Sequence, residues 1–237
     1  MTEPDLHALQ TSTKRRYRYF IDIVILIAAV FGLEIAAEAV YTPKTMEGGY
    51  VFGLVVQMIE VAIAWFLIRF RGETLSDIGL KRPRSWPRTI GIGVLLAAIV
   101  FATIYLSERA GFHRELSRFA ALQGNLRLTL IVVLYVLIGA GFYEEFMFRG
   151  FLMQGFAMFF GGSRVAWGVA LIVQAALFGV SHAYQNPLGI LITGTLGALL
   201  GVVVLVSGRN LWIAIIGHGL FDSSRSILFY FQGTPHS

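Results

Sequence analysis

Long apolar runs separated by short polar segments form the dominant pattern of the 237-residue sequence. Each run approaches the roughly 20 residues that an α-helix needs to cross the hydrocarbon core of a bilayer. Spans are predicted near residues 19–40, 50–70, 89–107, from 128 onward, 165–184, 188–206 and 211–231. The pattern therefore predicts an all-α polytopic membrane protein with about seven transmembrane helices.

Composition and charge narrow the class of protein further. Hydrophobic residues make up 56% and charged residues 14% of the chain, and the mean hydropathy is +0.70, whereas a soluble domain carries about 25% charged residues. The chain contains no cysteine, which excludes disulfides and thiolate chemistry. A sequence pI near 9.7 would favour nucleic-acid binding in a soluble protein. Here the basic residues lie between apolar runs, so they indicate orientation in a lipid bilayer, and no nucleic acid is expected as a partner.

The distribution of lysine and arginine predicts how the chain is oriented. With the N-terminus inside, the inner segments hold twelve of these residues and the outer segments hold five. Because cytoplasmic loops carry the excess of positive charge, the N-terminus is predicted in the cytoplasm and the C-terminus outside. Residues 1–18 are then a polar cytoplasmic tail, and residues 19–237 form a single transmembrane domain. The small size and the lack of organelle signals favour a bacterial inner membrane.

The polar segment between the third and fourth predicted spans allows two interpretations. Phe112, Leu116 and Phe119 recur at helical spacing, while Arg114 and Arg118 lie off that face. This pattern is typical of an amphipathic helix that lies at the membrane interface. A plain connecting loop explains the same residues.

Two adjacent carboxylates and an arginine follow the sixteen-residue uncharged run that begins the fourth span. A charge near the centre of the hydrocarbon costs roughly 2.5–3.5 kcal/mol on insertion scales. On a helix, Glu145 and Arg149 are four residues apart and can pair, whereas Glu144 points about 100° away. Glu144 is thus predicted to be the unpaired acid that faces the interior of the bundle. A helix end in the headgroup layer, where all three side chains are solvated, explains the same residues.

Two later stretches place ionisable groups inside apolar helices. The fifth predicted span ends near His182, and the first half of the seventh contains His218 and Asp222, which face one direction because they are four residues apart. Each histidine taken singly is explained by a hydrogen bond between helices. Together with the two glutamates and the arginine of the fourth span, these residues favour one shared polar cavity, because each of them is costly in lipid.

Such a cavity supports two kinds of chemistry. A carboxylate in it can take a proton from water and later pass that proton to a leaving amine. Histidines can hydrogen-bond the oxyanion of a tetrahedral intermediate or ligate a metal ion. Hydrolysis within the membrane and proton relay are therefore both compatible with these residue types.

Three motifs in this order resemble those of the CAAX-protease and bacteriocin-processing (Abi) family of intramembrane proteases: Glu144-Glu145-x-x-x-Arg149, Phe178-x-x-x-His182 and His218-x-x-x-Asp222. The resemblance covers about residues 126–231 and implies a catalytic core there. It also implies cleavage of peptide bonds near the membrane surface. Substrates of similar proteins include prenylated C-termini in eukaryotes and peptide precursors in bacteria, and other members act in bacteriocin immunity or regulation.

The same resemblance implies a role for each site residue. Glu144 would activate the attacking water, with Glu145 and Arg149 holding it in place. The residues that would complete the site are His182, His218 and Asp222.

Position 222 departs from the family's pattern and leaves two versions of the chemistry open. It is Asp where the better-studied prenyl proteases carry Asn, and a carboxylate cannot donate to an oxyanion unless it is protonated. In a metalloprotease version, the candidate ligands of a divalent metal such as zinc are Glu144, His182, His218 and Asp222. In a metal-free version that depends on the glutamate, Asp222 accepts from His218 or stays protonated, and it orients an imidazole that donates to the oxyanion.

The expected function is that of an intramembrane endopeptidase that uses Glu144-activated water on a membrane-associated peptide or protein tail. One alternative is a non-catalytic scaffold or bacteriocin-immunity protein of the same fold. Another is a small proton-coupled transporter with Glu34, Glu38 and Glu60 as a relay, which is disfavoured because the sequence shows no inverted repeat. The expected partners are a peptide or membrane-protein substrate and the lipid bilayer, and the cavity is expected to open towards the cytoplasm or laterally. The sequence specifies neither the substrate nor the oligomeric state.

Overall fold

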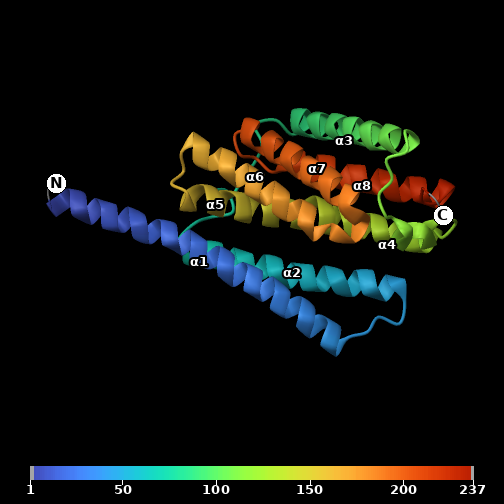
Figure 1. Cartoon of the computed structure of the whole chain (residues 1–237), viewed down its shortest axis with the longest axis horizontal. Helices are drawn as coiled ribbons and strands as arrows, with labels where there is room; N and C mark the ends of the chain where they lie inside the picture. The colour runs from blue at the N-terminus through green and yellow to red at the C-terminus, as the bar shows by residue number, and fades with distance from the viewer. Residues whose placement is uncertain (1–2, 236–237) are drawn as a thin grey trace.

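The computed structural model describes residues 3–235, with side chains described from residue 13 onward, and contains helices but no strand in that range (Figure 1). Its long helical segments are α1 (Glu3–Val40), α2 (Met46–Phe70), α3 (Trp86–Arg109), the continuous series α4 (Leu126–Val136), η2 (Leu137–Leu152) and α5 (Met153–Phe159), then α6 (Arg164–Ser181), α7 (Asn186–Val206) and α8 (Trp212–Gln232). Two short 3₁₀ turns lie between them, η1 (Ser117–Leu122) and η3 (Ala183–Gln185).

Six of these segments are long and apolar enough to cross a membrane, and they correspond to the first six predicted spans. The seventh predicted span forms α8, which is more polar because it carries His218, Asp222 and Arg225. This helix packs against α3, α4 and η2 (Figure 1). The prediction of an all-α polytopic membrane fold is confirmed, with α8 as a polar helix enclosed by apolar ones.

The fourth predicted span is longer than its apolar run suggested. The helical series from Leu126 continues without a break to Phe159, over 34 residues. Glu144 therefore lies near the middle of this segment. The end of the helix is not apparent in the sequence because the charged motif interrupts the apolar run.

The helices run up and down, so their connections gather at two ends of the bundle. At one end, Arg18 at the start of the first span donates to the carbonyl of Phe70. Lys81 Nζ donates to the Gly208 carbonyl (2.7 Å) at the same end. We call this the basic end, and its residues are 14–18, 69–88, 160–164 and 207–211.

The opposite end holds the remaining connections. The Glu115 N–H donates to the Gln185 carbonyl (3.1 Å), and the Gly124 N–H donates to the Tyr230 carbonyl (3.0 Å). The segment after α3 is thereby tied to the α6–α7 turn and to the end of α8. We call this the loop end, and its residues are 41–45, 110–125, 182–185 and 230–235.

The first helix extends beyond the membrane span that was predicted for it. Because α1 begins at Glu3, the polar tail predicted at residues 1–18 is helical from that point and continuous with the span; residues 1 and 2 lie outside the described part. Asp22 of this helix forms an ion pair with Arg71 (Oδ2 to Nη1, 2.9 Å), and both side chains are buried. This pair fixes α1 to the basic end.

Small residues allow α6 and α7 to pack backbone against backbone. A Cβ atom added to Gly179 would lie 2.6 Å from the Ile190 carbonyl oxygen and 3.1 Å from Gly194 Cα. In membranes, small residues at such crossings permit close helix approach. The crossing places the end of α6, where His182 follows, beside the start of α7.

The segment between α3 and α4 forms no amphipathic α-helix, so the interfacial-helix interpretation is wrong and the connecting-loop interpretation holds. It begins and ends with Gly111 and Gly124 at positive φ (96° and 68°), a conformation that does not propagate a helix. Between them, Leu116 and Leu122 are buried and pack with Phe229 of α8. The loop is therefore anchored on the bundle instead of lying along the membrane surface.

The α6–α7 crossing predicts different outcomes for two glycines of the same helix. We expect Gly179→Ala to destabilise the protein by about 1–3 kcal/mol, because the new methyl group meets backbone atoms that cannot move independently. Gly168→Ala is the matched control: nothing lies within 4 Å of its added Cβ, so its helix propensity favours a neutral or stabilising effect. Thermal unfolding in detergent measures both, and equal effects would contradict the close crossing.

Candidate active site

The segment that carries the two glutamates is wound more widely than an α-helix. Over Leu137–Leu152 it is a π-helix, and at its end the Met153 N–H donates to the carbonyl of Phe148, five residues back. Such wide turns are rare and are frequently found at functional sites. Glu144, Glu145 and Arg149 all lie within this segment, so its winding sets the directions of the three side chains.

Glu145 and Arg149 form the ion pair that their spacing predicted. Glu145 Oε1 lies 2.9 Å from Arg149 Nη1, and both side chains are fully buried. The guanidinium also donates to the Gly197 carbonyl (3.3 Å) and stacks 4.3 Å over the ring of Phe178. Arg149 thereby links the π-helical segment to α6 and α7, and neutralises a carboxylate in the core.

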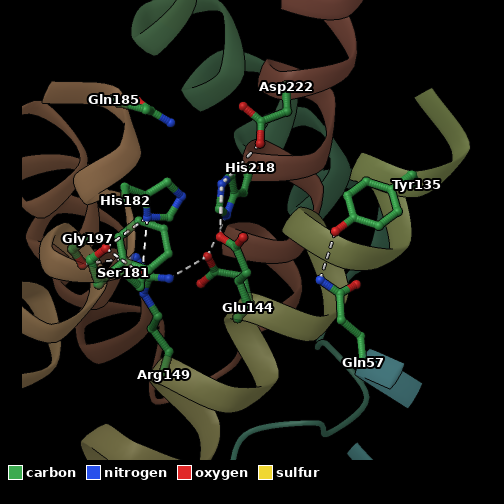
Figure 2. Close-up of polar contacts among 12 residues, drawn as sticks. Gln57, Tyr135, Glu144, Arg149, Ser181, His182, Gln185, Gly197, His218 and Asp222 are labelled. Atoms are coloured by element: carbon green, nitrogen blue, oxygen red, sulfur yellow. Dashed lines mark hydrogen bonds and ion pairs between the residues drawn. The ribbon is translucent and has the colours of Figure 1, made fainter. Parts of the chain in front are cut away.

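His218 of α8 is held from both sides of its ring. Its Nδ1 lies 2.8 Å from Glu145 Oε1, and its Nε2 lies 3.4 Å from Asp222 Oδ2 and 3.8 Å from Glu144 Oε2. Because Glu145 accepts from Nδ1–H, Nε2 can donate towards the two other carboxylates only when the ring is an imidazolium. The geometry therefore favours a positively charged His218 that points its second N–H into the site (Figure 2).

Glu144 differs from its neighbour in having no hydrogen-bond partner among the described residues. Its Oε2 is buried and has no hydrogen-bond partner there, and the Nε2 of His218 lies 3.8 Å from it. The free acid predicted from the sequence is thus found facing the site (Figure 2). A carboxylate with unused acceptor positions can hold a water molecule.

His182 lies just beyond the last residue of α6 and faces the same space. Its Nδ1 lies 2.8 Å from the Phe178 carbonyl oxygen and 3.2 Å from Ser181 Oγ. When Nδ1–H donates to that carbonyl, Nε2 of the neutral ring is left as an acceptor. Figure 2 shows the His182 ring across from Glu144 and His218.

A cavity of about 190 Å³ joins these groups. A water molecule needs roughly 10–15 Å³ of such volume, so several waters or part of a peptide fit inside. Four of the six predicted site residues line the cavity: Glu144, His182, His218 and Asp222. The other two, Glu145 and Arg149, lie behind it and hold His218 and the helix in place.

Sequence reasoning missed several polar residues of the cavity wall. Tyr135 accepts a hydrogen bond from Gln57 Nε2 (3.1 Å), and Tyr184 and Gln185 come from the α6–α7 turn. Arg225 lines the wall and is bound by Glu108, with both carboxylate oxygens 2.8 Å from its Nη2. The position of Arg225 within the seventh predicted span was the feature of the sequence that could have indicated the Glu108–Arg225 pair.

The metal-binding version of the site depends on how the candidate ligands are arranged. In the part of the chain that the structure describes, no group of three or more His, Asp or Glu side chains is arranged to hold a metal ion. The Nδ1 atoms of His182 and His218 are directed at the Phe178 carbonyl and at Glu145. These contacts leave the Nε2 atoms of both histidines available to a ligand, as in many metal-binding histidines, so zinc dependence stays a prediction.

The proposed relay of the transporter alternative is not continuous. Glu60 is fully buried and accepts from the hydroxyl of Tyr143, while its Oε1 has no hydrogen-bond partner among the described residues. Glu34 and Glu38 lie exposed on α1. No hydrogen bond joins the three carboxylates within the described range.

Comparison with known proteins gives one finding. Residues 126–224 match the family described as type II CAAX prenyl endopeptidase Rce1-like. The match spans the three motifs and confirms the resemblance that they predicted. No curated protein and no solved structure matches the chain.

The buried ion pair predicts a contrast in stability among the motif residues. We expect Glu145→Gln and Arg149→Ala each to lower the free energy of unfolding by about 3–5 kcal/mol, because each leaves a buried charge without its partner. Glu144→Gln should change it little, since Glu144 has no hydrogen bond to any described residue. Arg127→Ala, at an exposed position of α4, controls for loss of positive charge. Denaturation in mixed micelles measures all four, and equal stabilities would contradict the anchoring role.

Proposed function

We propose that this chain, whose residues 126–224 match the type II CAAX prenyl endopeptidase Rce1-like family, is an intramembrane endopeptidase that depends on Glu144. Its substrate is a membrane-associated peptide or the tail of a membrane protein, and its partners are that substrate and the lipid bilayer. The observation that carries the proposal is the Glu144 carboxylate, whose buried Oε2 has no hydrogen-bond partner among the described residues and which lines a cavity together with two histidines.

The first step is activation of a water molecule in the cavity. Glu144 accepts one proton of this water, and the neutral Nε2 of His182 accepts a hydrogen bond from the other. The oxygen then attacks the carbonyl carbon of the scissile peptide bond, while the proton passes to Glu144. Both acceptors face the same space, so the water is held by two groups from different helices (Figure 2).

The second step is stabilisation of the negative charge that develops on the carbonyl oxygen. His218 as an imidazolium donates to this oxyanion through Nε2, which already points into the cavity. Glu145 and Asp222 flank the ring at 2.8 and 3.4 Å and favour its charged form. Arg149 balances the charge of Glu145 and does not touch the substrate.

Collapse of the intermediate completes the reaction. Glu144 gives the proton that it took from water to the leaving nitrogen, the carbon–nitrogen bond breaks, and a carboxylic acid and an amine are released. One carboxylate thus serves as base and then as acid. This sequence needs a single unpaired glutamate, which fits the different surroundings of Glu144 and Glu145.

The protein is proposed to act in a bacterial inner membrane with its N-terminus in the cytoplasm. Twelve lysine and arginine residues gather at the basic end, compared with five at the loop end or its adjoining helix termini. The oligomeric state does not enter the mechanism, because all groups used come from one chain.

Substitution of the base is the direct test of the proposal. We expect Glu144→Gln to lower peptide hydrolysis by about 10²–10⁴-fold, the usual contribution of a general acid–base, because an amide cannot take the proton. Quantitative terminal proteomics of membranes from cells that carry the wild type or the variant measures the loss of new peptide termini. Glu115→Gln, an exposed carboxylate of the loop end, is the matched control. Identical termini with the wild type and Glu144→Gln would favour the scaffold or immunity alternative.

The residue at position 222 separates the metal-free mechanism from the zinc-dependent one. We expect Asp222→Asn to retain activity, because the amide oxygen can still accept from His218 while the amide nitrogen adds a donor near the oxyanion. Elemental analysis of the purified protein accompanies the assay. Stoichiometric zinc in the wild type that is lost in Asp222→Asn, with activity partly recovered by added zinc, would establish the metal version instead.

A further inference from the structure

The cavity is built from one half of the bundle. Beyond the catalytic residues, its wall continues into the loop end through Arg114, Leu116, Arg118 and Phe119 of the α3–α4 loop. The α6–α7 turn contributes two further residues, and Tyr50 at the start of α2 and Phe229 near the end of α8 complete this side. In the described part of the chain, no residue of the basic end lines the cavity.

Exposure increases from the catalytic groups towards that end. The side chain of His218 is 10% exposed, whereas the side chain of Asp222, one turn nearer the loop end, is 28% exposed. Tyr184 in the α6–α7 turn is 45% exposed, and Arg118 stacks 4.3 Å over its ring from the α3–α4 loop. The mouth of the cavity therefore lies at the loop end, between these two residues and the end of α8.

The basic end carries an excess of positive charge, which is typical of cytoplasmic segments. Twelve of the nineteen lysines and arginines lie in the residues of the basic end. The fold brings these segments together, since Tyr17 packs its ring against Phe159 (6.4 Å) and Lys81 binds the Gly208 carbonyl. Their charges therefore act on the same membrane surface, and an excess of this kind indicates the cytoplasmic side.

We infer that the cavity opens on the extracytoplasmic side of the membrane, and, resting on the proposed function, that its substrates are peptide segments presented from that side. This differs from the expectation of a cytoplasmic or lateral opening. With this orientation, prenylated cytoplasmic tails cannot reach the site, because they would meet the basic end, where the cavity is closed. A membrane-protein segment or precursor peptide in the outer half of the bilayer can reach Glu144 through the mouth.

The absence of cysteine from the chain makes a direct test possible. Ser117→Cys in the α3–α4 loop and Ser76→Cys at the basic end are a matched pair: both replace an exposed loop serine, and neither belongs to the site. Ser226→Cys and Tyr184→Cys report on the cavity, because Ser226 lines its wall and Tyr184 its mouth. Each variant is expressed in a bacterial host and treated with a small membrane-impermeant thiol reagent, in intact spheroplasts and after permeabilisation.

The inference predicts that Ser117→Cys, Tyr184→Cys and at least the accessible fraction of Ser226→Cys react in intact spheroplasts. Ser76→Cys should react only after permeabilisation. The reverse pattern for the two loop serines would overturn the inference. Reaction of Ser117→Cys with neither cavity variant reacting would also overturn it, because the mouth would then not open at that surface.

Failure of the inference and failure of the proposed function give different results. Labelling requires no proteolysis. The expected labelling pattern, without any new peptide termini that depend on Glu144, would therefore support the orientation and contradict the protease function. Conversely, new peptide termini that depend on Glu144 but lie in cytoplasmic segments of membrane proteins would support the protease function. They would contradict a cavity that opens on the extracytoplasmic side. Glu144-dependent termini in extracytoplasmic segments, with the expected labelling, support both.

Discussion

Ionised side chains inside a membrane protein are costly unless each has a partner of opposite charge and further hydrogen bonds. In this bundle the constraint centres on Glu145, whose Oε1 lies 2.9 Å from Arg149 Nη1 and 2.8 Å from His218 Nδ1. One carboxylate thereby compensates an arginine and fixes the ring of a histidine from another helix. The direction of His218, the link from Arg149 to the Gly197 carbonyl, and the freedom of Glu144 all depend on this contact.

Close helix packing makes that contact possible. A Cβ added to Gly141 would lie 3.0 Å from Gly219 Cα and 3.1 Å from the Ile215 carbonyl oxygen, so the π-helical segment and α8 meet backbone to backbone. Gly179 plays the same part between α6 and α7. Since side chains are absent where the π-helical segment crosses α8, Glu145 and His218 come within hydrogen-bonding range. Packing and chemistry are therefore set by the same glycines.

The division of roles between the adjacent glutamates explains how one site can be both stable and reactive. Glu145 binds Arg149 and His218 through its Oε1 and supports the fold, whereas Glu144 has no hydrogen bond to any described residue and faces a cavity large enough for water. Polar residues in the cavity wall are neutralised separately, as in the buried pair of Glu108 with Arg225. The aspartate at position 222 fits this scheme as an acceptor 3.4 Å from His218 Nε2, where it favours the charged ring.

The sequence by itself determined the all-α membrane fold, because runs of apolar residues long enough to cross a bilayer have few other stable states. It also determined the pairing of Glu145 with Arg149, since a spacing of four residues places two side chains on one face whether the turn is α-helical or wider. Other features needed the tertiary structure: the uninterrupted helix through Phe159, the anchored loop at 110–125, the Glu145–His218 contact, and the cavity's mouth at the loop end. These depend on distances between helices, which are set by how small residues pack at each crossing and not by any periodicity along the chain.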